Sequence, residues 1–121
     1  MSKLAIKSVG FTAYPVSDME RATAFYRDAV GLGDPIMLHD RWAEFYLNDT
    51  TFAVVTGGEE MGIAPGSAFA VAFEADDYGA AVEQLRAHGV EIDNEYDGPT
   101  CRAIFARDPD GNRFSVHKLK A

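Results

Sequence analysis

Apolar and polar residues along this chain alternate with two different periods. Stretches in which every second residue is apolar predict half-buried strands, and stretches in which apolar residues recur three and four positions apart predict amphipathic helices. The first half of the chain predicts strands at about 7–16, 36–39, 41–48 and 51–56 and a helix at 17–30. The second half predicts strands at 67–74, 90–94, 101–107 and 112–119 and a helix at 77–88. The order strand, helix, strand, strand, strand therefore occurs twice.

Residues typical of helix ends flank both predicted helices. Ser17 and Glu20 form a capping-box pattern, and Asp18 places negative charge at the positive end of the helix dipole. Gly31 and Gly89 suit the left-handed conformation that ends a helix. The first helix carries one apolar stripe, which predicts that it packs on a core. The members of this stripe are Ala22, Phe25, Tyr26 and Ala29.

The second half of the chain echoes the first at a constant offset, which makes Asp18 coincide with Asp77. An internal repeat of this kind predicts two similar structural units. We therefore predict an α+β fold, a single domain over 1–121 made of two βαβββ modules at about 1–57 and 67–121. Each sheet would be covered by its helix on one face, and the two bare faces would enclose a cleft.

Strand alternation assigns the side chains of the first module to faces. A two-residue turn at Asp49-Thr50 would pair Leu47 with Phe52, and cross-strand partners share a face. The set predicted to lie beneath the first helix is apolar and consists of Phe45, Leu47, Phe52 and Val54. The cleft face would carry Trp42, Glu44, Tyr46, Ala53 and Val55. The same register places Trp42, the single tryptophan, opposite Gly57.

The second module ends in a hairpin around the turn Asp108-Pro109-Asp110-Gly111. Pro109 fixes φ at about −65° and Gly111 tolerates positive φ, so the segment predicts a tight turn that pairs Arg107 with Asn112. The helix face would carry Cys101, Ala103, Phe105, Phe114 and Val116. The cleft face would carry Arg102, Ile104, Arg113, Ser115 and His117. Cys101 is thus expected to act as a small buried apolar residue.

Composition restricts the classes of partner. The 121 residues include 11 Lys and Arg against 19 Asp and Glu, a formal net charge of −8 that disfavours contact with nucleic-acid phosphates. This charge favours solubility, and it would also attract a cationic small molecule. A single cysteine excludes an internal disulfide, and the sequence has neither a signal-peptide pattern nor an apolar run of membrane-spanning length. We therefore expect a cytoplasmic protein without nucleic-acid or membrane partners.

Two segments resemble the vicinal oxygen chelate superfamily, which holds glyoxalase I, the bleomycin resistance proteins and the extradiol dioxygenases. The first, Val16 to Leu32, has the pattern Val-x-Asp, then Arg-Ala and Phe-Tyr within a helix, then a stop at Gly31. The second is the turn Asp-Pro-Asp-Gly-Asn at Asp108 to Asn112. The resemblance implies paired βαβββ modules, a small-molecule ligand in the cleft and, for a chain of this size, a homodimer.

In metal-dependent members of this superfamily, four strand positions supply His, Gln or Glu ligands to one divalent ion. The resemblance places these positions at Phe11, Ala70 and Ser115, with the fourth at Ala53 or Val54. Apolar side chains offer no donor atom, and a lone serine hydroxyl is a poor ligand for a divalent cation. The resemblance therefore implies a metal-free member without a cofactor.

The favoured function is a metal-free binding protein that sequesters an aromatic or planar, partly polar molecule, such as an antibiotic of the bleomycin type or an aromatic metabolite. Trp42 and Tyr46 would supply stacking faces, and charged side chains would fix the polar ends of the ligand. The predicted ligand-binding residues are Phe11, Trp42, Glu44, Tyr46, Glu74, Arg102, Arg113, Ser115 and His117.

Two alternatives are enzymatic. A metal-free enzyme could use His117 as general base, with Arg102 or Arg113 stabilising an enolate-like charge. A lyase, isomerase or dioxygenase-like enzyme of the same superfamily would need a metal site at positions other than those given above. His117 could also be an ordinary hydrogen-bonded surface group, and Trp42 could pack at a dimer interface instead of a ligand.

Overall fold

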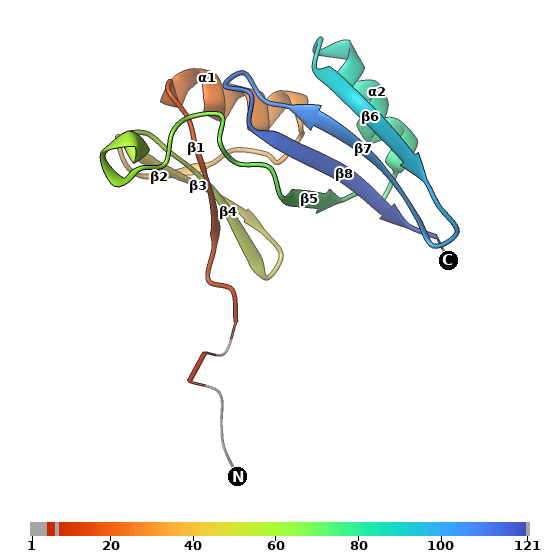
Figure 1. Cartoon of the computed structure of the whole chain (residues 1–121), viewed down its shortest axis with the longest axis horizontal. Coiled ribbons are helices and arrows are strands. Elements are labelled where there is room, and N and C mark those ends of the chain that lie inside the picture. Colours follow the sequence, from red (N-terminus) through yellow and green to blue (C-terminus); the bar gives the residue numbers. More distant parts are fainter. Residues whose placement is uncertain (1–4, 7, 121) are drawn as a thin grey trace.

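The computed structural model of this protein describes residues 5, 6 and 8–120, which form two four-stranded sheets (Figure 1). The first sheet has the order β1-β4-β3-β2 and the second the order β5-β8-β7-β6. In each sheet the first strand of the module runs parallel to the last, and the other neighbours are antiparallel. This topology confirms the predicted α+β fold of two βαβββ modules. The strands are β1 (Thr12–Pro15), β2 (Ile36–His39), β3 (Trp42–Leu47), β4 (Thr50–Val55), β5 (Val71–Glu74), β6 (Glu91–Asp97), β7 (Cys101–Arg107) and β8 (Arg113–Leu119).

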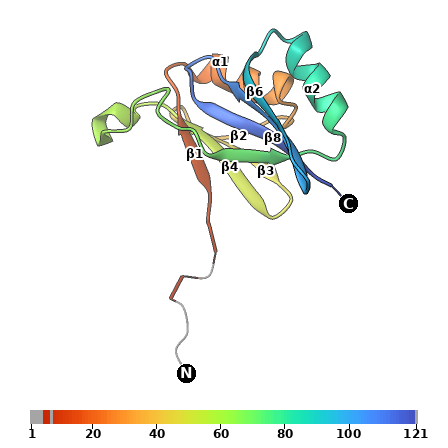
Figure 2. The same ribbon diagram turned by 45° about the vertical axis from the view of Figure 1, so that its right-hand side comes forward.

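One helix belongs to each module, and both helices lie on the same side of the two sheets (Figures 1 and 2). Helix α1 spans Met19–Ala24 and continues as a π-helix over Phe25–Ala29, while α2 spans Tyr78–Ala87. We call the other side of each sheet its bare face. None of the helices in the described part of the chain is long and apolar enough to cross a membrane.

The two helices begin at equivalent aspartates. The Oδ1 atom of Asp18 accepts a hydrogen bond from the backbone N–H of Arg21 at 2.9 Å, and that of Asp77 accepts one from Ala80 at 3.0 Å. The expected capping box at Ser17 was wrong, because the Ser17 hydroxyl instead donates to a carboxylate in the β7–β8 loop at 2.5 Å. The internal repeat is therefore real at the level of helix capping, although the sequences have diverged.

The helix-facing sides of both sheets share one aromatic core. The Tyr26 ring, fully buried on the π-helix, lies 4.8 Å from Phe52 of the first sheet and 6.0 Å from Phe114 of the second, measured between ring centroids. Phe52 also contacts Phe73 of β5 in a T-shaped arrangement at 5.1 Å. Such contacts favour edge-to-face geometry, and here they join the two modules across their common boundary.

A buried polar joint also links the modules. Asn112, which is fully buried, donates through Nδ2 to the Pro15 carbonyl oxygen at 2.7 Å and to Asp108 at 2.9 Å, and its Oδ1 accepts from the Ala68 N–H at 3.1 Å. The Tyr26 hydroxyl donates to the same Asp108 carboxylate at 2.7 Å. Burial raises the pKa of Asp108 and, more strongly, that of Tyr26. We refer to these five residues as the polar joint.

The first hairpin differs from its predicted register by two residues. Leu47 pairs with Thr50, so the turn is Asn48-Asp49 and not Asp49-Thr50, and Asn48 adopts a left-handed conformation with φ of 55°. Asparagine tolerates this conformation better than most residues. Because a shift of two residues preserves the alternation, the predicted faces remain correct, with Phe45 opposite Phe52 in the core.

The second hairpin differs from its predicted register by one residue, and this exchanges the two faces of β7. Arg107 pairs with Arg113, because Asn112 is part of a five-residue loop in which its carbonyl oxygen accepts from the Asp108 N–H at 2.9 Å. A one-residue shift moves every side chain of a strand to the other face. The predicted faces of β7 were therefore wrong: Arg102 and Ile104 lie on the helix side, whereas Cys101, Ala103 and Phe105 lie on the bare face.

Several strand boundaries also differ from those predicted. The strand expected at 7–16 is confined to Thr12–Pro15, and Lys7 lies outside the described residues. The segment between the modules contains a short 3-10 helix at Gly58–Met61, and β5 begins only at Val71. Strand β6 extends to Asp97, beyond its predicted end.

Candidate functional site

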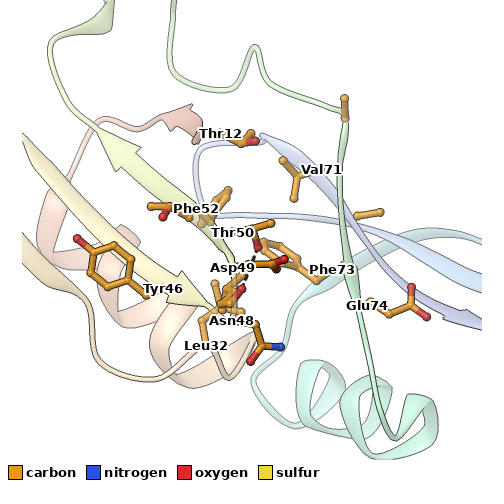
Figure 3. A pocket seen from close by; sticks show the side chains of 14 residues that line it. Thr12, Leu32, Tyr46, Asn48, Asp49, Thr50, Phe52, Val71, Phe73 and Glu74 are labelled. Atoms are coloured by element: carbon orange, nitrogen blue, oxygen red, sulfur yellow. Dashed lines mark hydrogen bonds between the residues drawn. The ribbon is translucent and has the colours of Figure 1, made fainter. Parts of the chain in front are cut away.

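A groove of about 830 Å³ separates the two modules on one side of the shared core (Figure 3). Residues 46–52 at the tip of the β3–β4 hairpin form one wall, and residues 70–74 in and before β5 form the other. The contact between Phe52 and Phe73 closes the space between these walls. We call this hollow the inter-module groove, and its mixed apolar and polar lining suits a small organic ligand.

Three alternate residues of β3 form a hydrogen-bonded row on the bare face of the first sheet. The indole Nε1 of Trp42 donates to Glu44 Oε2 at 2.7 Å, and the hydroxyl of Tyr46 donates to Glu44 Oε1 at 2.6 Å. These bonds, the one from Tyr46 first, hold the pKa of Glu44 below its ordinary value, and Glu44 raises the pKa of Tyr46. Glu44 is therefore a carboxylate held between two aromatic side chains.

Small residues lie beside the Glu44 carboxylate on β4 and β1. The Phe11 ring adds a further aromatic group next to Trp42. Glu44 pairs with Ala53 of β4, which pairs in turn with Ala13 of β1, so no long side chain covers Glu44 from the neighbouring strands on that side. The ring of Phe11 meets that of Trp42 edge-on, with 5.0 Å between centroids and an interplanar angle of 88°. We call Phe11, Trp42, Glu44 and Tyr46 the carboxylate–aromatic cluster; Tyr46 also borders the inter-module groove.

The bare face of the second sheet carries a histidine–carboxylate pair. The Nδ1 atom of His117 is in hydrogen-bonding contact with Oε1 of Glu74, and the second oxygen of Glu74 accepts from the Leu119 N–H at 3.0 Å. These contacts, above all the one with His117, lower the pKa of Glu74. Ser115 lies in the same strand as His117 but is largely buried. The pair resembles the base-and-orienter arrangement used in acid–base catalysis.

A second, smaller hollow of about 390 Å³ lies near the start of β8. It is lined by Phe69, Phe105, Arg113, Asp93 and Asn94. The Nε atom of Arg113 is 3.8 Å from the Asp93 carboxylate, and the Nε atom of Arg107 is closer to the same carboxylate, at 2.7 Å. Phe69 and Phe105, 75% and 41% exposed, were not among the predicted site residues. Phe105 was missed because of the register error in β7. Phe69 was missed because the strand predicted at 67–74 begins only at Val71, so Phe69 does not follow the alternation of β5.

Two sequence-based placements need correction. The guanidinium carbon of Arg102 lies 4.5 Å from the centre of the Tyr78 ring on α2, so Arg102 is on the helix side and far from the predicted cleft face. Trp42 lies opposite Val55, not Gly57, while the Arg41 side chain occupies the space beside Gly57. Of the nine predicted residues, Tyr46 and Glu74 line the inter-module groove, and Arg113 lines the smaller hollow.

The positions that the family resemblance assigns to metal ligands do not fit a divalent ion. Phe11, Ala53 and Ala70 have no donor atom in their side chains, and Ser115 offers one neutral hydroxyl. Within residues 5, 6 and 8–120, no three His, Cys, Asp or Glu side chains converge in a way that could hold a metal ion. The polar and aromatic groups available on the bare faces thus include aromatic rings, carboxylates, a histidine, the thiol of Cys101 and the two arginines Arg107 and Arg113.

The fold defines a class of α+β proteins built from two βαβββ modules, each a four-stranded sheet with one helix. A model of the Glyoxalase/Bleomycin resistance protein/Dioxygenase superfamily matches residues 8–116, and the chain belongs to this superfamily. A search of curated proteins found no match.

Solved structures extend this assignment. The chain is similar to TnmS3, an antibiotic binding protein from Streptomyces sp. CB03234, with 30% identity, a TM-score of 0.83 and coverage of 98% of this chain and 100% of the other. It is also similar to a glyoxalase/bleomycin resistance protein from the same organism, with 32% identity, a TM-score of 0.74 and coverage of 90% and 98%. A lactoylglutathione lyase from Agrobacterium tumefaciens shares the fold at 20% identity, with a TM-score of 0.77 and coverage of 93% and 94%.

Proposed function

We propose that this protein is a metal-free binding protein that sequesters an aromatic or planar, partly polar small molecule, such as an antibiotic or an aromatic metabolite. The observation that carries the proposal is the replacement of all four expected ligand positions by residues that cannot hold a divalent ion, at Phe11, Ala53, Ala70 and Ser115. Without such an ion, binding is the function that the remaining aromatic and polar groups support best.

Two further observations support this proposal. TnmS3, which resembles the chain over its whole length, is an antibiotic binding protein. In addition, the inter-module groove and the carboxylate–aromatic cluster meet at Tyr46, whose side chain is 52% exposed. A planar ligand lying along this border would contact both surfaces, and each ring it stacks upon would contribute roughly 0.5–1.5 kcal/mol beyond area burial.

We also propose that the whole chain, 1–121, acts as one domain and pairs with a second copy as a homodimer. The bare faces carry large side chains that stay exposed in a single chain, among them Phe69 at 75% and Tyr96 at 51%. Sedimentation at micromolar concentration that gave only a 13.2 kDa species would contradict pairing.

The test of the binding function combines recovery of ligand with metal analysis. Native mass spectrometry and thermal shifts against a library of antibiotics and aromatic metabolites should identify compounds that stabilise the protein. After prolonged incubation, each such compound should be recovered chemically unchanged. Conversion of a compound to product, or one tightly held divalent ion per chain, would overturn the proposal.

A second function is favoured by one specific observation, the contact between His117 and Glu74. A carboxylate that orients Nδ1 leaves Nε2 to accept a proton, which a lyase or isomerase of this superfamily could use. Under this alternative His117→Ala would abolish turnover of a compound while leaving its binding intact. Under the binding proposal the wild-type protein does not convert the compound either. Turnover by the wild type that is lost in His117→Ala would therefore favour the enzyme.

A further inference from the structure

Glu44 carries a negative charge that no cation in the described part of the chain neutralises. The ion pairs found among residues 5, 6 and 8–120 all involve other carboxylates. The two donors that Glu44 does have, the Trp42 indole and the Tyr46 hydroxyl, are neutral. They orient the carboxylate and favour its ionised form but leave its full charge in place. Each oxygen has received one of these bonds and retains a free lone pair.

The rings around Glu44 favour the same sign of partner. Aromatic faces are the negative side of the ring quadrupole and attract cations, most strongly for tryptophan. Phe11 and Trp42 pack in a T-shaped arrangement with 5.0 Å between ring centroids, and the Phe11 and Tyr46 side chains are 53% and 52% exposed. An anion would be repelled by Glu44, and a hydrated metal ion would find only one carboxylate.

We propose that the carboxylate–aromatic cluster binds the protonated amine of its ligand, with Glu44 as the counter-ion and the rings of Phe11, Trp42 and Tyr46 around the cationic group. The inference rests on the proposed binding function and narrows the ligand to planar molecules that carry a basic nitrogen. The rest of the ligand would extend past Tyr46 into the inter-module groove. The chain's net charge of −8 would assist the approach of such a cation.

Three probes that share the naphthalene ring but differ in charge test the inference: 2-naphthylmethylamine, which is an ammonium ion at neutral pH, 2-naphthylmethanol, which is neutral, and 2-naphthoate, which is an anion. Trp42 is the only tryptophan, so its indole N–H gives a single resonance in a ¹⁵N-labelled sample, and this group touches Glu44 directly. Titrations that follow this resonance should show the ammonium probe binding at least about fivefold more tightly than the alcohol. The naphthoate should bind least.

Glu44→Gln keeps the size of the side chain and removes its charge, and it should reduce the preference for the ammonium probe to within about twofold. Glu59→Gln removes the same charge from an exposed residue of the 3-10 helix and should leave the preference unchanged, which controls for general attraction by an acidic protein. Raising the salt concentration should weaken the preference for the ammonium probe in the wild-type protein and in Glu59→Gln, which both keep Glu44. It should have little effect in Glu44→Gln.

The outcomes separate the two proposals. Equal binding of the ammonium and alcohol probes, or a preference for the ammonium that survives in Glu44→Gln, would overturn the amine inference while leaving this face as a binding surface. If none of the probes shifts the Trp42 resonance, the face does not bind planar molecules, and the inference falls. In that case the binding function stands or falls separately, on the library screen.

Discussion

Removal of the Asn112 side chain should destabilise the protein more than its position in a surface hairpin loop would suggest. Asn112→Ala deletes three hydrogen bonds, to the Pro15 carbonyl, the Ala68 N–H and the Asp108 carboxylate. Asp108 still accepts from the Tyr26 hydroxyl, so its own loss is small. The Pro15 carbonyl loses a partner from the other module, and the Ala68 N–H loses a partner from its own module.

The magnitude follows from these two orphaned groups. A buried backbone group without a partner costs about 1–3 kcal/mol, and water can partly replace the bond to Ala68, which is only half-buried. We therefore expect the free energy of unfolding to fall by roughly 2–4 kcal/mol. For a domain of this size, a loss of about 3 kcal/mol corresponds to a fall in Tm of roughly 10–15 °C.

Urea unfolding measures this loss, and one fixed protein concentration keeps the concentration-dependent contribution of any monomer–dimer equilibrium the same in both proteins. Asn94→Ala is the matched control, because Asn94 is exposed and its Oδ1 accepts only from the neighbouring Glu95 N–H at 2.8 Å, so its removal should cost less than about 0.5 kcal/mol. Hydrogen exchange should also accelerate at the Ala68 amide in Asn112→Ala. A loss below about 1 kcal/mol with unchanged exchange at Ala68 would refute the polar joint as a link between the modules.

The remaining predictions concern metal, tryptophan, pH and the corrected strand. Purified protein should contain no stoichiometric Zn, Ni, Mn or Fe, and EDTA should leave Tm unchanged; a lower Tm would reveal a metal that stabilises the native state. A ligand from the screen should quench the fluorescence of Trp42, and Trp42→Ala should lose affinity while keeping its oligomeric state; a monomeric variant with unchanged affinity would place Trp42 at an interface. Because burial raises the pKa of Tyr26 well above 10.0, the unfolded chain ionises first and stability should fall as pH rises past about 10. Tyr26→Phe should flatten this alkaline decline, and an identical slope would contradict the raised pKa. Arg102→Ala should lower the free energy of unfolding by about 0.5–1 kcal/mol, because it removes the contact with Tyr78, and should leave ligand affinity unchanged. Weaker ligand binding in this variant would mean that Arg102 lies on the cleft face.

The fold could be predicted from the sequence because its signals are local and occur twice. Strand alternation, helix periodicity and the two N-terminal aspartates, Asp18 and Asp77, lie within short segments and agree with one another. The faces of β3 and β4 were also predictable, since an error of two residues in a hairpin leaves the alternation intact. The row formed by Trp42, Glu44 and Tyr46 follows directly from this alternation.

The rest depended on contacts between distant residues. The sequence suggests that Asn112 is the first residue of a strand, but its side chain instead donates to the Pro15 carbonyl from within the loop. This makes the loop five residues long and shifts the register, which exchanges the two faces of β7. The hydroxyl of Tyr26 reaches a carboxylate 82 residues away, which no local pattern encodes. The inter-module groove likewise arises from how the hairpin tip and β5 approach each other, and not from a motif in either segment.

The polar joint breaks the symmetry between the two halves of a repeated architecture. In the second module the loop between the last two strands reaches into the first module through Asn112 and Asp108. The equivalent turn of the first module, Asn48-Asp49, makes no such reach and instead forms part of a wall of the groove. The two modules thus use their last hairpins differently: the β7–β8 loop links the modules, and the β3–β4 turn lines the inter-module groove. Substitutions in the Asn48-Asp49 turn should therefore affect the inter-module groove, whereas substitutions at Asn112 and Asp108 should affect the link between the modules.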